Sequence, residues 1–345
     1  MRKLLNTVFI TTPNLYLRLD GANLVVWDDK KQMGRIPLHN LEGIITNNYV
    51  GMSPALMGEC MNRNIAISFL NSTGKLQCRV LGPTFGNVLL RKSQYLKSES
   101  EIDSLAISKN FIIGKLFNQR WVLERFTRDH ELRVDSRLFK NVSNELKEGI
   151  DLIRKGNVKN LEELRGIEGQ LASRYFFVFD QMVIQQKNSF SFRGRSRRPP
   201  LDPVNALLSL SYTLLTHDCA AALESVGLDP YVGFMHQDRP GRLSLALDLL
   251  EELRGVYADK FCLSLINRRI LSKKHFLEKE SGAVLLTDEG RKIFFDSWQA
   301  KKVEKLQHPF LGEQIQWGLV PYVQALLLAR YLRGDLDEYP PFLWK

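Results

Sequence analysis

Short apolar runs that end at turn-forming residues dominate roughly the first ninety residues of the chain. Runs of this length, rich in β-branched and aromatic residues, are typical of β-strands. We expect strands at Thr7–Thr11, Tyr16–Leu19, Leu24–Trp27, Ile44–Thr46 and Ile65–Phe69. The second and third should pair as a hairpin across Asp20-Gly21-Ala22-Asn23. Ser53-Pro54 should cap and open a helix between two of these strands.

From about Asn87 onward the apolar residues recur every three or four positions, which predicts helices instead of strands. This periodicity covers roughly 87–97, 102–130, 135–156, 159–186, 203–225, 240–257, 259–272, 287–306 and 317–334. Glycine and proline cluster between these stretches, as expected for connecting loops. The pattern predicts an α+β protein with a small β-rich N-terminal domain at 1–92 and a larger all-helical C-terminal domain at 93–345.

A glutamate interrupts the apolar face of the helix expected at 159–186. The apolar positions of that face are Leu161, Leu164, Leu171, Tyr175 and Val178. Glu168 occupies the step at which the spacing calls for another apolar residue. A carboxylate that faces a core is costly unless it is paired or binds a cation. Glu168 is therefore a candidate functional residue, and the alternative is a position at the solvated margin of the stripe.

The leucine-rich stretch 242–254 carries three acids on one side of its predicted helix. Asp248, Glu251 and Glu252 fall within about 100 degrees of one another around a helix axis. Like charges on one arc repel each other unless water or a cation intervenes. A solvated face is the usual explanation, but the surrounding leucines leave little room for a wide one.

The turn-rich segment 232–241 leads into that helix and contains His236. A lone histidine is most often a hydrogen-bonded structural residue. If His236 instead meets Glu168 and Glu251, two carboxylates and one imidazole suit a hard divalent ion, Mg²⁺ or Mn²⁺. The imidazole favours Mn²⁺, and Zn²⁺ stays an alternative without support from a cysteine or an HExxH motif. Such a site can polarise a phosphoryl oxygen and activate water or a sugar hydroxyl.

The formal net charge of +10 favours an anionic partner such as nucleic acid, although solubility alone is the alternative. The stretch after the Glu168 helix interleaves arginines with Phe190 and Phe192, a composition suited to phosphate contacts and base stacking. A flexible, solvated loop is the alternative. The candidate DNA-contacting arginines are Arg193, Arg195, Arg197, Arg198, Arg242 and Arg254. Arg254 lies three residues after Glu251, where it could bind a scissile phosphate.

The cysteine usage and the hydropathy of the sequence favour a cytoplasmic location for the protein. The four cysteines form no CxxC pair, which is typical of reduced thiols. No run of eighteen apolar residues is present, so we expect no membrane span, and no signal-peptide cleavage site follows the basic start. The chain also lacks GxSxG, Walker A and Rossmann glycine patterns, which disfavours the enzyme classes that use them.

Several long segments of the sequence can be compared with a known family. They are Arg165–Gly169 with Tyr175-Phe176, Arg198–Leu208, Gly227–His236, Arg239–Arg242 with Leu247–Glu252, and Leu332–Trp344. Together they resemble the CRISPR-associated endonuclease and integrase of the adaptation module, the "Cas one" family, in its type I-C-like form. The resemblance covers nearly the whole chain.

The resemblance implies a β domain used for homodimerisation and a helical domain with one metal site, whose ligands are Glu168, His236 and Glu251. It implies strand transfer in antiviral defence, in which the 3′-hydroxyl of a short DNA fragment, the spacer, attacks a phosphodiester of a CRISPR repeat array. It also implies a small partner, the "Cas two" protein, that bridges two dimers. In this interpretation Asp248 either orients one of the metal-binding side chains or is itself an additional metal ligand. Tyr175 and Tyr212 are candidates for positioning DNA ends, and core packing is the alternative for each.

We therefore predict a divalent-metal-dependent endonuclease and integrase that acts on double-stranded DNA. Two alternatives stay open. The first is a non-enzymatic, basic DNA-binding scaffold whose acids are structural. The second is an unrelated metal-dependent RNA nuclease.

Overall fold

The computed structural model describes residues 6–10, 12, 14–29, 31–47, 51–63, 65–70, 76–80, 82, 88–196 and 198–345, which fold as two compact units. The first unit comprises Met1–Phe85, Thr287–Glu304 and Gln316–Leu319, and the second comprises Gly86–Leu286, Lys305–Ile315 and Val320–Lys345. The sequence-based boundary after residue 92 lies inside helix α2 (Val88–Glu99). The first unit also includes helix α9 (Asp288–Val303), which the sequence analysis assigned to the helical domain.

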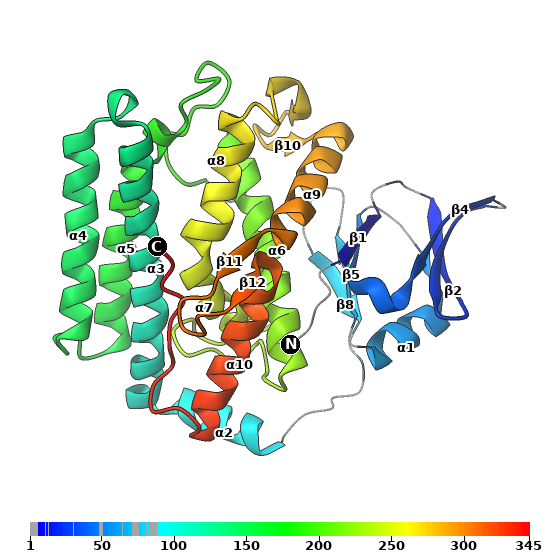
Figure 1. Cartoon of the computed structure of the whole chain (residues 1–345), viewed down its shortest axis with the longest axis horizontal. Helices are drawn as coiled ribbons and strands as arrows, with labels where there is room; N and C mark the ends of the chain where they lie inside the picture. The colour runs from blue at the N-terminus through cyan, green and yellow to red at the C-terminus, as the bar shows by residue number, and fades with distance from the viewer. Residues whose placement is uncertain are drawn as a thin grey trace. The chain divides into compact units, whose positions relative to one another are not determined.

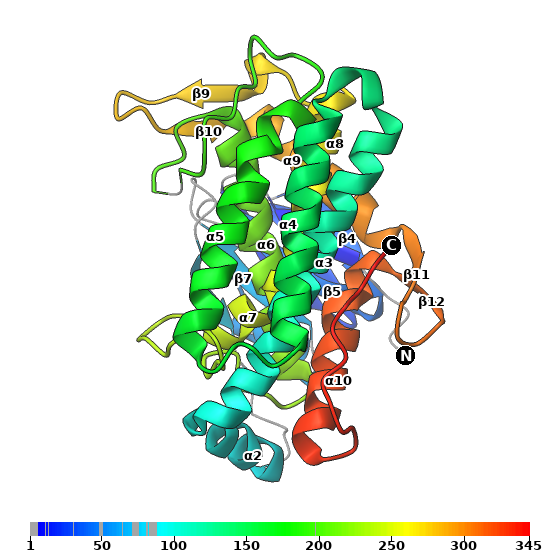
Figure 2. The ribbon, with the colours of Figure 1, turned by 90° about the vertical axis from the view of Figure 1, so that its left-hand side faces the viewer.

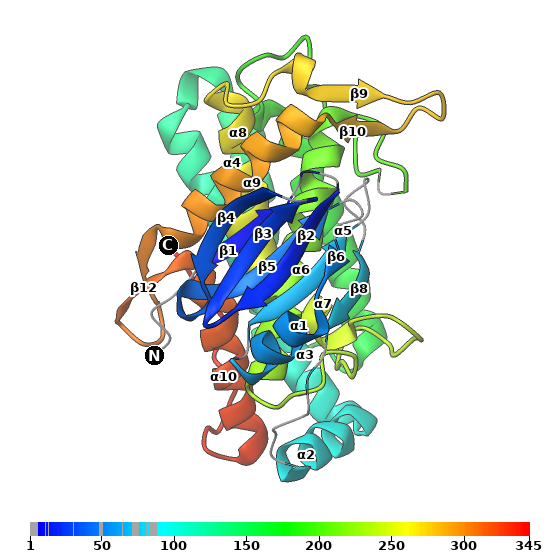
Figure 3. The ribbon, with the colours of Figure 1, turned by 90° about the vertical axis from the view of Figure 1, so that its right-hand side faces the viewer.

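The described strands of the first unit form two four-stranded sheets (Figure 3). One sheet has the order β4-β3-β2-β6, with β2 (Leu15–Asp20), β3 (Asn23–Asp28), β4 (Lys31–Pro37) and β6 (Gly51–Met52). The other has the order β1-β5-β7-β8, with β1 (Asn6–Ile10), β5 (Leu41–Asn47), β7 (Ala66–Leu70) and β8 (Leu76–Val80). The predicted hairpin is confirmed, because β2 and β3 pair antiparallel and Gly21 turns the chain with a φ of +57°.

Helix α1 (Pro54–Asn62) begins where the sequence predicts, since the Ser53 side chain accepts a hydrogen bond from the Leu56 backbone N–H at 3.3 Å. Leu56 and Cys60 of this helix are fully buried in the core of the first unit. Helix α9 packs on the same unit through Phe295, whose ring stacks on that of Phe9 at a centroid distance of 4.7 Å. The β-rich N-terminal fold expected from the sequence is therefore confirmed.

Helices make up most of the second unit. Its helices are α2, α3 (Glu101–Asp129), α4 (Ser136–Arg154), α5 (Leu161–Phe179), α6 (Pro203–Ser225), α7 (Ser244–Leu253), α8 (Lys260–Asn267) and α10 (Val320–Arg333). Helices α3, α4 and α5 lie side by side (Figures 1 and 2). The predicted helices are therefore present in the predicted order.

The structure differs from the predicted helices in two ways, by a π-helical turn and by two short hairpins. The stretch 240–272 is not two simple helices, because a π-helical turn at Arg254–Asp259 (η4) joins α7 to α8. Two short hairpins, β9 (Phe276–Glu278) with β10 (Val284–Leu286) and β11 (Lys305–Gln307) with β12 (Gln314–Gln316), were not expected. Strands of three residues are too short to show a two-residue alternation in the sequence. The region is therefore mostly helical, with short strands between helices.

Close packing of α3 against α7 positions the acids of α7. A Cβ atom on Gly114 of α3 would lie 2.8 Å from the Cβ of Glu252. One turn later, the Asn118 side-chain amide donates to the backbone carbonyls of Glu252 at 2.6 Å and Phe342 at 2.7 Å. Helix α3 therefore fixes both α7 and the C-terminal segment, and this fit requires a glycine at position 114.

We expect Gly114→Ala to destabilise the protein by about 1–3 kcal/mol, because the added methyl group must push α7 away from α3. The matched control is Gly166→Ala on α5, where an added Cβ meets no atom within 4 Å. That change should stabilise the helix by up to about 1 kcal/mol. Urea unfolding of both variants measures the difference, and equal midpoints would show that the contact at Gly114 does not constrain the packing.

Candidate active site

Glu168 interrupts the buried face of α5 as the sequence predicts. Leu164 and Tyr175 on that face are fully buried, whereas the Glu168 side chain is 22% exposed. Its Oε1 forms an ion pair with the ammonium of Lys115 on α3, whose side chain is 2% exposed. Glu168 thus lies at the edge of the helical core and is paired with a buried cation.

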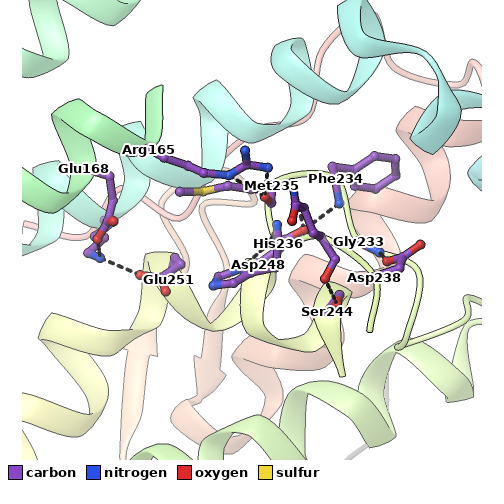
Figure 4. Close-up of polar contacts among 12 residues, drawn as sticks. Arg165, Glu168, Gly233, Phe234, Met235, His236, Asp238, Ser244, Asp248 and Glu251 are labelled. Carbon is purple, nitrogen blue, oxygen red and sulfur yellow. Dashed lines mark hydrogen bonds and ion pairs between the residues drawn. The ribbon is translucent and has the colours of Figure 1, made fainter. Parts of the chain in front are cut away.

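The Lys115 ammonium also joins Glu168 to a second carboxylate. Its Nζ lies 2.7 Å from Oε2 of Glu251, which comes from α7 and is 5% exposed (Figure 4). The other oxygen of Glu251, Oε1, lies 2.8 Å from the Arg254 guanidinium, one turn further along the chain. Three helices therefore contribute to one cluster of opposite charges from which water is largely excluded, and in which ion pairs are stronger than on the surface.

The charge of Glu251 is fixed by its neighbours. Burial alone would raise the pKa of Glu251, but the positive charges of Arg254 and Lys115 outweigh burial and lower the pKa to about 2. Burial would lower the pKa of Arg254, and Glu251 is the main group that instead raises it. The carboxylate is therefore ionised throughout the neutral pH range, as a residue that binds a cation must be.

Asp248 holds His236 in place. The Nδ1 atom of His236 lies 2.6 Å from Oδ1 of Asp248, which is fully buried (Figure 4). Because an ionised carboxylate can only accept this hydrogen bond, the proton lies on Nδ1, and Nε2 is the nitrogen left for a further partner. The same carboxylate accepts backbone hydrogen bonds from Phe234 at 2.7 Å, Met235 at 3.1 Å and His236 at 3.0 Å. Asp248 therefore fixes both the turn and the tautomer of the histidine.

The loop that carries His236 is attached to both neighbouring helices. Arg165, one turn before Glu168 on α5, donates to the backbone carbonyl of Met235 at 2.6 Å (Figure 4). A Cβ on Gly233 would lie 2.8 Å from both the His236 carbonyl oxygen and the Ser244 Cβ, so only glycine fits this turn. These contacts link the histidine loop to the helices that carry the two glutamates.

The third acid of α7 belongs to a separate network. Glu252 is fully buried and accepts hydrogen bonds from the Tyr339 hydroxyl, from Gln324 Nε2 at 3.0 Å and from the Phe342 backbone N–H at 2.7 Å. Burial outweighs these hydrogen bonds and raises the pKa of Glu252 to about 7. The repulsion expected among the three acids is thus avoided, because each acid of α7 has its own set of partners.

The π-helical turn after α7 builds a cationic and aromatic stack beside Glu251. Two guanidinium groups lie over the ring of Tyr212, with Arg254 Cζ at 4.8 Å and Arg195 Cζ at 5.2 Å from its centroid. The Tyr212 hydroxyl donates to Asp259, the last residue of the turn. Burial raises the pKa of Asp259 to about 6, even though Tyr212, Arg254 and Arg195 act to lower it. Turns of this type often occur at functional sites, and this one directs Arg254 back toward Glu251.

The side chains of Glu168, Glu251 and His236 suit a hard divalent cation in their chemistry, since they offer two carboxylates and an imidazole whose Nε2 is not bonded to Asp248. The position shared by Glu168 and Glu251 already favours positive charge, because a lysine ammonium lies there. In the part of the chain that the structure describes, no three His, Cys, Asp or Glu side chains lie close enough together to hold a metal ion. The structure therefore brings Glu168 and Glu251 to one cation, the ammonium of Lys115. That Glu168, His236 and Glu251 together bind a metal ion stays a prediction.

The remaining candidate residues divide into exposed and buried ones. Arg193 and Arg198 are exposed, and Arg242 is partly exposed in the loop before α7. Arg195 instead donates to Asn205 Oδ1 at 2.6 Å and packs on Tyr212, which is a structural arrangement. Tyr175 is fully buried among aromatic rings, in the core position that was the alternative for this residue. Arg197 lies outside the described residues.

Lys115 was not predicted from the sequence, although the signal that identified Glu168 is present there as well. Lys115 interrupts the apolar segment Phe111–Phe117 of α3, and a charge in such a segment needs a partner. The roles of Arg165 and Asp259 were not predicted either, since they depend on contacts to the His236 loop and to Tyr212. Contacts between residues so far apart in sequence leave no periodic pattern.

Comparisons with known proteins give the family. Residues 8–300 match the family described as CRISPR associated protein Cas1. A Rhodospirillum rubrum protein named CRISPR-associated endonuclease Cas1 2 is 52% identical over 347 residues, with 100% of both chains covered. A Chlorobaculum tepidum protein named CRISPR-associated endonuclease Cas1 1 is 46% identical over 345 residues, again with 100% of both covered.

Solved structures share the fold. A casposase bound to integration product has a TM-score of 0.82 at 25% identity, covering 99% of this chain and 95% of its own. A CAS1 protein from Thermotoga maritima has a TM-score of 0.80 at 20% identity, covering 97% and 99%. A chain of a Cas6-RT-Cas1–Cas2 complex has a TM-score of 0.81 at 21% identity, covering 100% of this chain and 36% of its own.

These comparisons define the class of the protein as a CRISPR-associated endonuclease, which confirms the enzyme class predicted from the sequence. The chain belongs to the Cas1 family.

Of the described helices, none is long and apolar enough to span a bilayer.

We expect Glu252 to make stability pH-dependent. A carboxyl whose pKa is raised to about 7 on folding contributes stability below its ordinary pKa, and that stability is lost as the pH rises through about 7. The loss should approach roughly 3 kcal/mol between about pH 5 and about pH 8. Urea unfolding in EDTA should therefore show wild type losing stability relative to Glu252→Gln. Parallel pH profiles for the two proteins would contradict the assignment.

Proposed function

We propose that this protein is a divalent-metal-dependent DNA endonuclease and integrase that inserts short DNA fragments into a CRISPR repeat array. The observation that supports this most is the cation shared by Glu168 and Glu251, two largely buried carboxylates from different helices. We infer that Glu168, His236 and Glu251 hold Mg²⁺ or Mn²⁺ and that Lys115 withdraws its ammonium when the ion binds. The type I-C-like subgroup and a cytoplasmic location are parts of the same proposal.

In this proposal the chain's own residues prepare the reaction. Asp248 keeps the proton on Nδ1 of His236, so that Nε2 is free to bind the ion. Arg254, held at 2.8 Å from Glu251, lies where it can contact a phosphate oxygen of the DNA. When bound, the ion supplies Lewis-acid stabilisation of charge on the scissile phosphate and lowers the pKa of the attacking hydroxyl. The 3′-hydroxyl oxygen forms the new P–O bond as the repeat's own 3′-oxygen leaves.

The DNA is proposed to approach over the loop that follows α5. Arg193 and Arg198 of this loop are exposed and available for phosphate contacts, whereas Arg195 anchors the loop to Asn205 and Tyr212. Arg242 extends the basic surface at the start of α7. Arg197 remains a candidate from the sequence and lies outside the described residues. Tyr212 also remains a candidate, and its ring supports the guanidinium of Arg254.

The proposed assembly is a homodimer formed through the β-rich domain, with two dimers bridged by the "Cas two" protein. A chain of the same fold occurs in a solved Cas6-RT-Cas1–Cas2 complex, and another occurs in a casposase bound to integration product. These relatives support a partner protein and a DNA substrate for this chain.

We expect Glu168→Ala to abolish strand transfer and cleavage in Mn²⁺ and Mg²⁺ while leaving folding and DNA binding largely intact. The matched control is Glu162→Ala, an exposed acid on the same helix, which should keep wild-type activity. Joining of a short duplex to a supercoiled plasmid that carries the repeat, with and without the small partner, measures both. Wild-type joining by Glu168→Ala would assign the acids a structural role and favour the DNA-binding scaffold.

We expect the double change Arg193→Ser with Arg198→Ser to weaken duplex binding at low salt. If both side chains contact phosphates, the slope of log affinity against log salt should fall by about 2. Arg137→Ser, at an exposed position of α4, provides the control for a loss of charge alone. Fluorescence anisotropy with labelled DNA at several salt concentrations gives the slopes, and an unchanged slope in the double variant would exclude these contacts.

A further inference from the structure

A cavity lies in the helical unit, between the C-terminal half of α3, the η4–α8 segment and the end of the chain. Its volume is about 290 Å³, close to the lower limit for small-molecule sites. Aromatic and basic side chains dominate its lining. The ones that matter here are Trp121, Arg125, Arg128, Lys260 and Trp344.

The positive charge of Arg125 in this cavity is not balanced by a paired carboxylate. The Arg125 guanidinium lies 4.1 Å from the centroid of the Trp344 ring, and the Lys260 ammonium lies 4.8 Å from it. Burial lowers the pKa of Arg125, Arg128 lowers it further, and Asp129 only partly opposes them. Asp129 is itself paired with Arg128 at 3.0 Å. Among the described residues, no carboxylate forms an ion pair with Arg125.

The cavity lining also contains a hydrogen-bond donor without an acceptor. The indole N–H of Trp121 is buried and has no hydrogen-bond partner among the described residues. A buried donor left unpaired costs about 1–3 kcal/mol, so such groups usually face a ligand or water. An arginine without a paired carboxylate and an unused donor together indicate a ligand that carries negative charge and hydrogen-bond acceptors.

We propose that this cavity binds one nucleotide. Its phosphate would contact Arg125, Arg128 and Lys260, and its base would pack against the indoles of Trp121 and Trp344. An acidic peptide would satisfy the cations but would offer no flat ring to the two indoles. The nucleotide comes either from free nucleotides or from a single-stranded DNA end, and the chemistry of recognition is the same for both.

Both walls of the cavity also carry residues of the candidate active site. Lys115 and Arg125 are ten residues apart on α3, which corresponds to about 15 Å along a helix. On the opposite wall, η4 begins with Arg254 and continues through Val256, which lines the cavity. A nucleotide bound here would lie close to the site without occupying it. The inference goes beyond the proposed function, since it holds whether or not the protein joins DNA.

The test is titration of the full-length protein with deoxycytidine monophosphate in EDTA, followed by calorimetry and by tryptophan fluorescence. We expect saturable binding, at least tenfold tighter than that of deoxycytidine or of inorganic phosphate, with quenching that is reduced in Trp344→Phe. Arg125→Gln should weaken binding at least tenfold. Arg18→Gln should not, although Arg18 lies over Trp27 at 5.6 Å in a similar arrangement elsewhere in the chain.

Arg128→Gln provides a second variant, because the Arg128 side chain is 73% exposed and can be replaced without disturbing the core. It should weaken binding at least threefold while the melting temperature stays unchanged. Competition with a short 5′-phosphorylated oligodeoxycytidine then identifies the source, since a DNA end should displace the mononucleotide at lower concentration than a second mononucleotide does. Absence of saturable binding, or equal affinity in wild type, Arg125→Gln and Arg128→Gln, would overturn the proposal.

Discussion

The ammonium of Lys115 is the contact on which the candidate active site depends. It is almost completely buried and pairs with Glu168 of α5 and with Glu251 of α7. Without a cation at this position, two carboxylates with little access to water would repel each other and separate their helices. The pairing therefore explains how acids can lie inside a leucine-rich bundle. It also explains why the same position suits a divalent ion, which would supply more positive charge to the same oxygens.

The surrounding contacts fix this cluster from several directions. Helix α3 provides Lys115, and its Gly114 and Asn118 hold α7 at close range. Asp248 secures the His236 turn, and Arg165 ties that turn to α5. The π-helical turn directs Arg254 toward Glu251. The acids of α7 thus differ in role according to their partners, since Glu251 is held ionised whereas Glu252 has a pKa of about 7.

Much of this arrangement could be predicted from the sequence, because it depends on periodic patterns and local turn chemistry. The stripe around Glu168, the acids of α7 and the Ser53-Pro54 helix start are all local signals. The short hairpins, the π-helical turn and the membership of α9 in the first unit depend on packing between distant segments, so no local pattern shows them. Lys115 was missed even though its apolar surroundings give the same local signal as those of Glu168. Its partners, however, lie on two other helices, and only the fold brings them together.

We propose that the cation position between Glu168 and Glu251 takes a divalent ion. An anomalous difference map from crystals grown in Mn²⁺ tests it directly. We expect one strong peak bounded by the carboxylates of Glu168 and Glu251 and by Nε2 of His236, with the Lys115 ammonium moved away. A map at saturating Mn²⁺ with no peak there, and with Lys115 still between the two carboxylates, would contradict it.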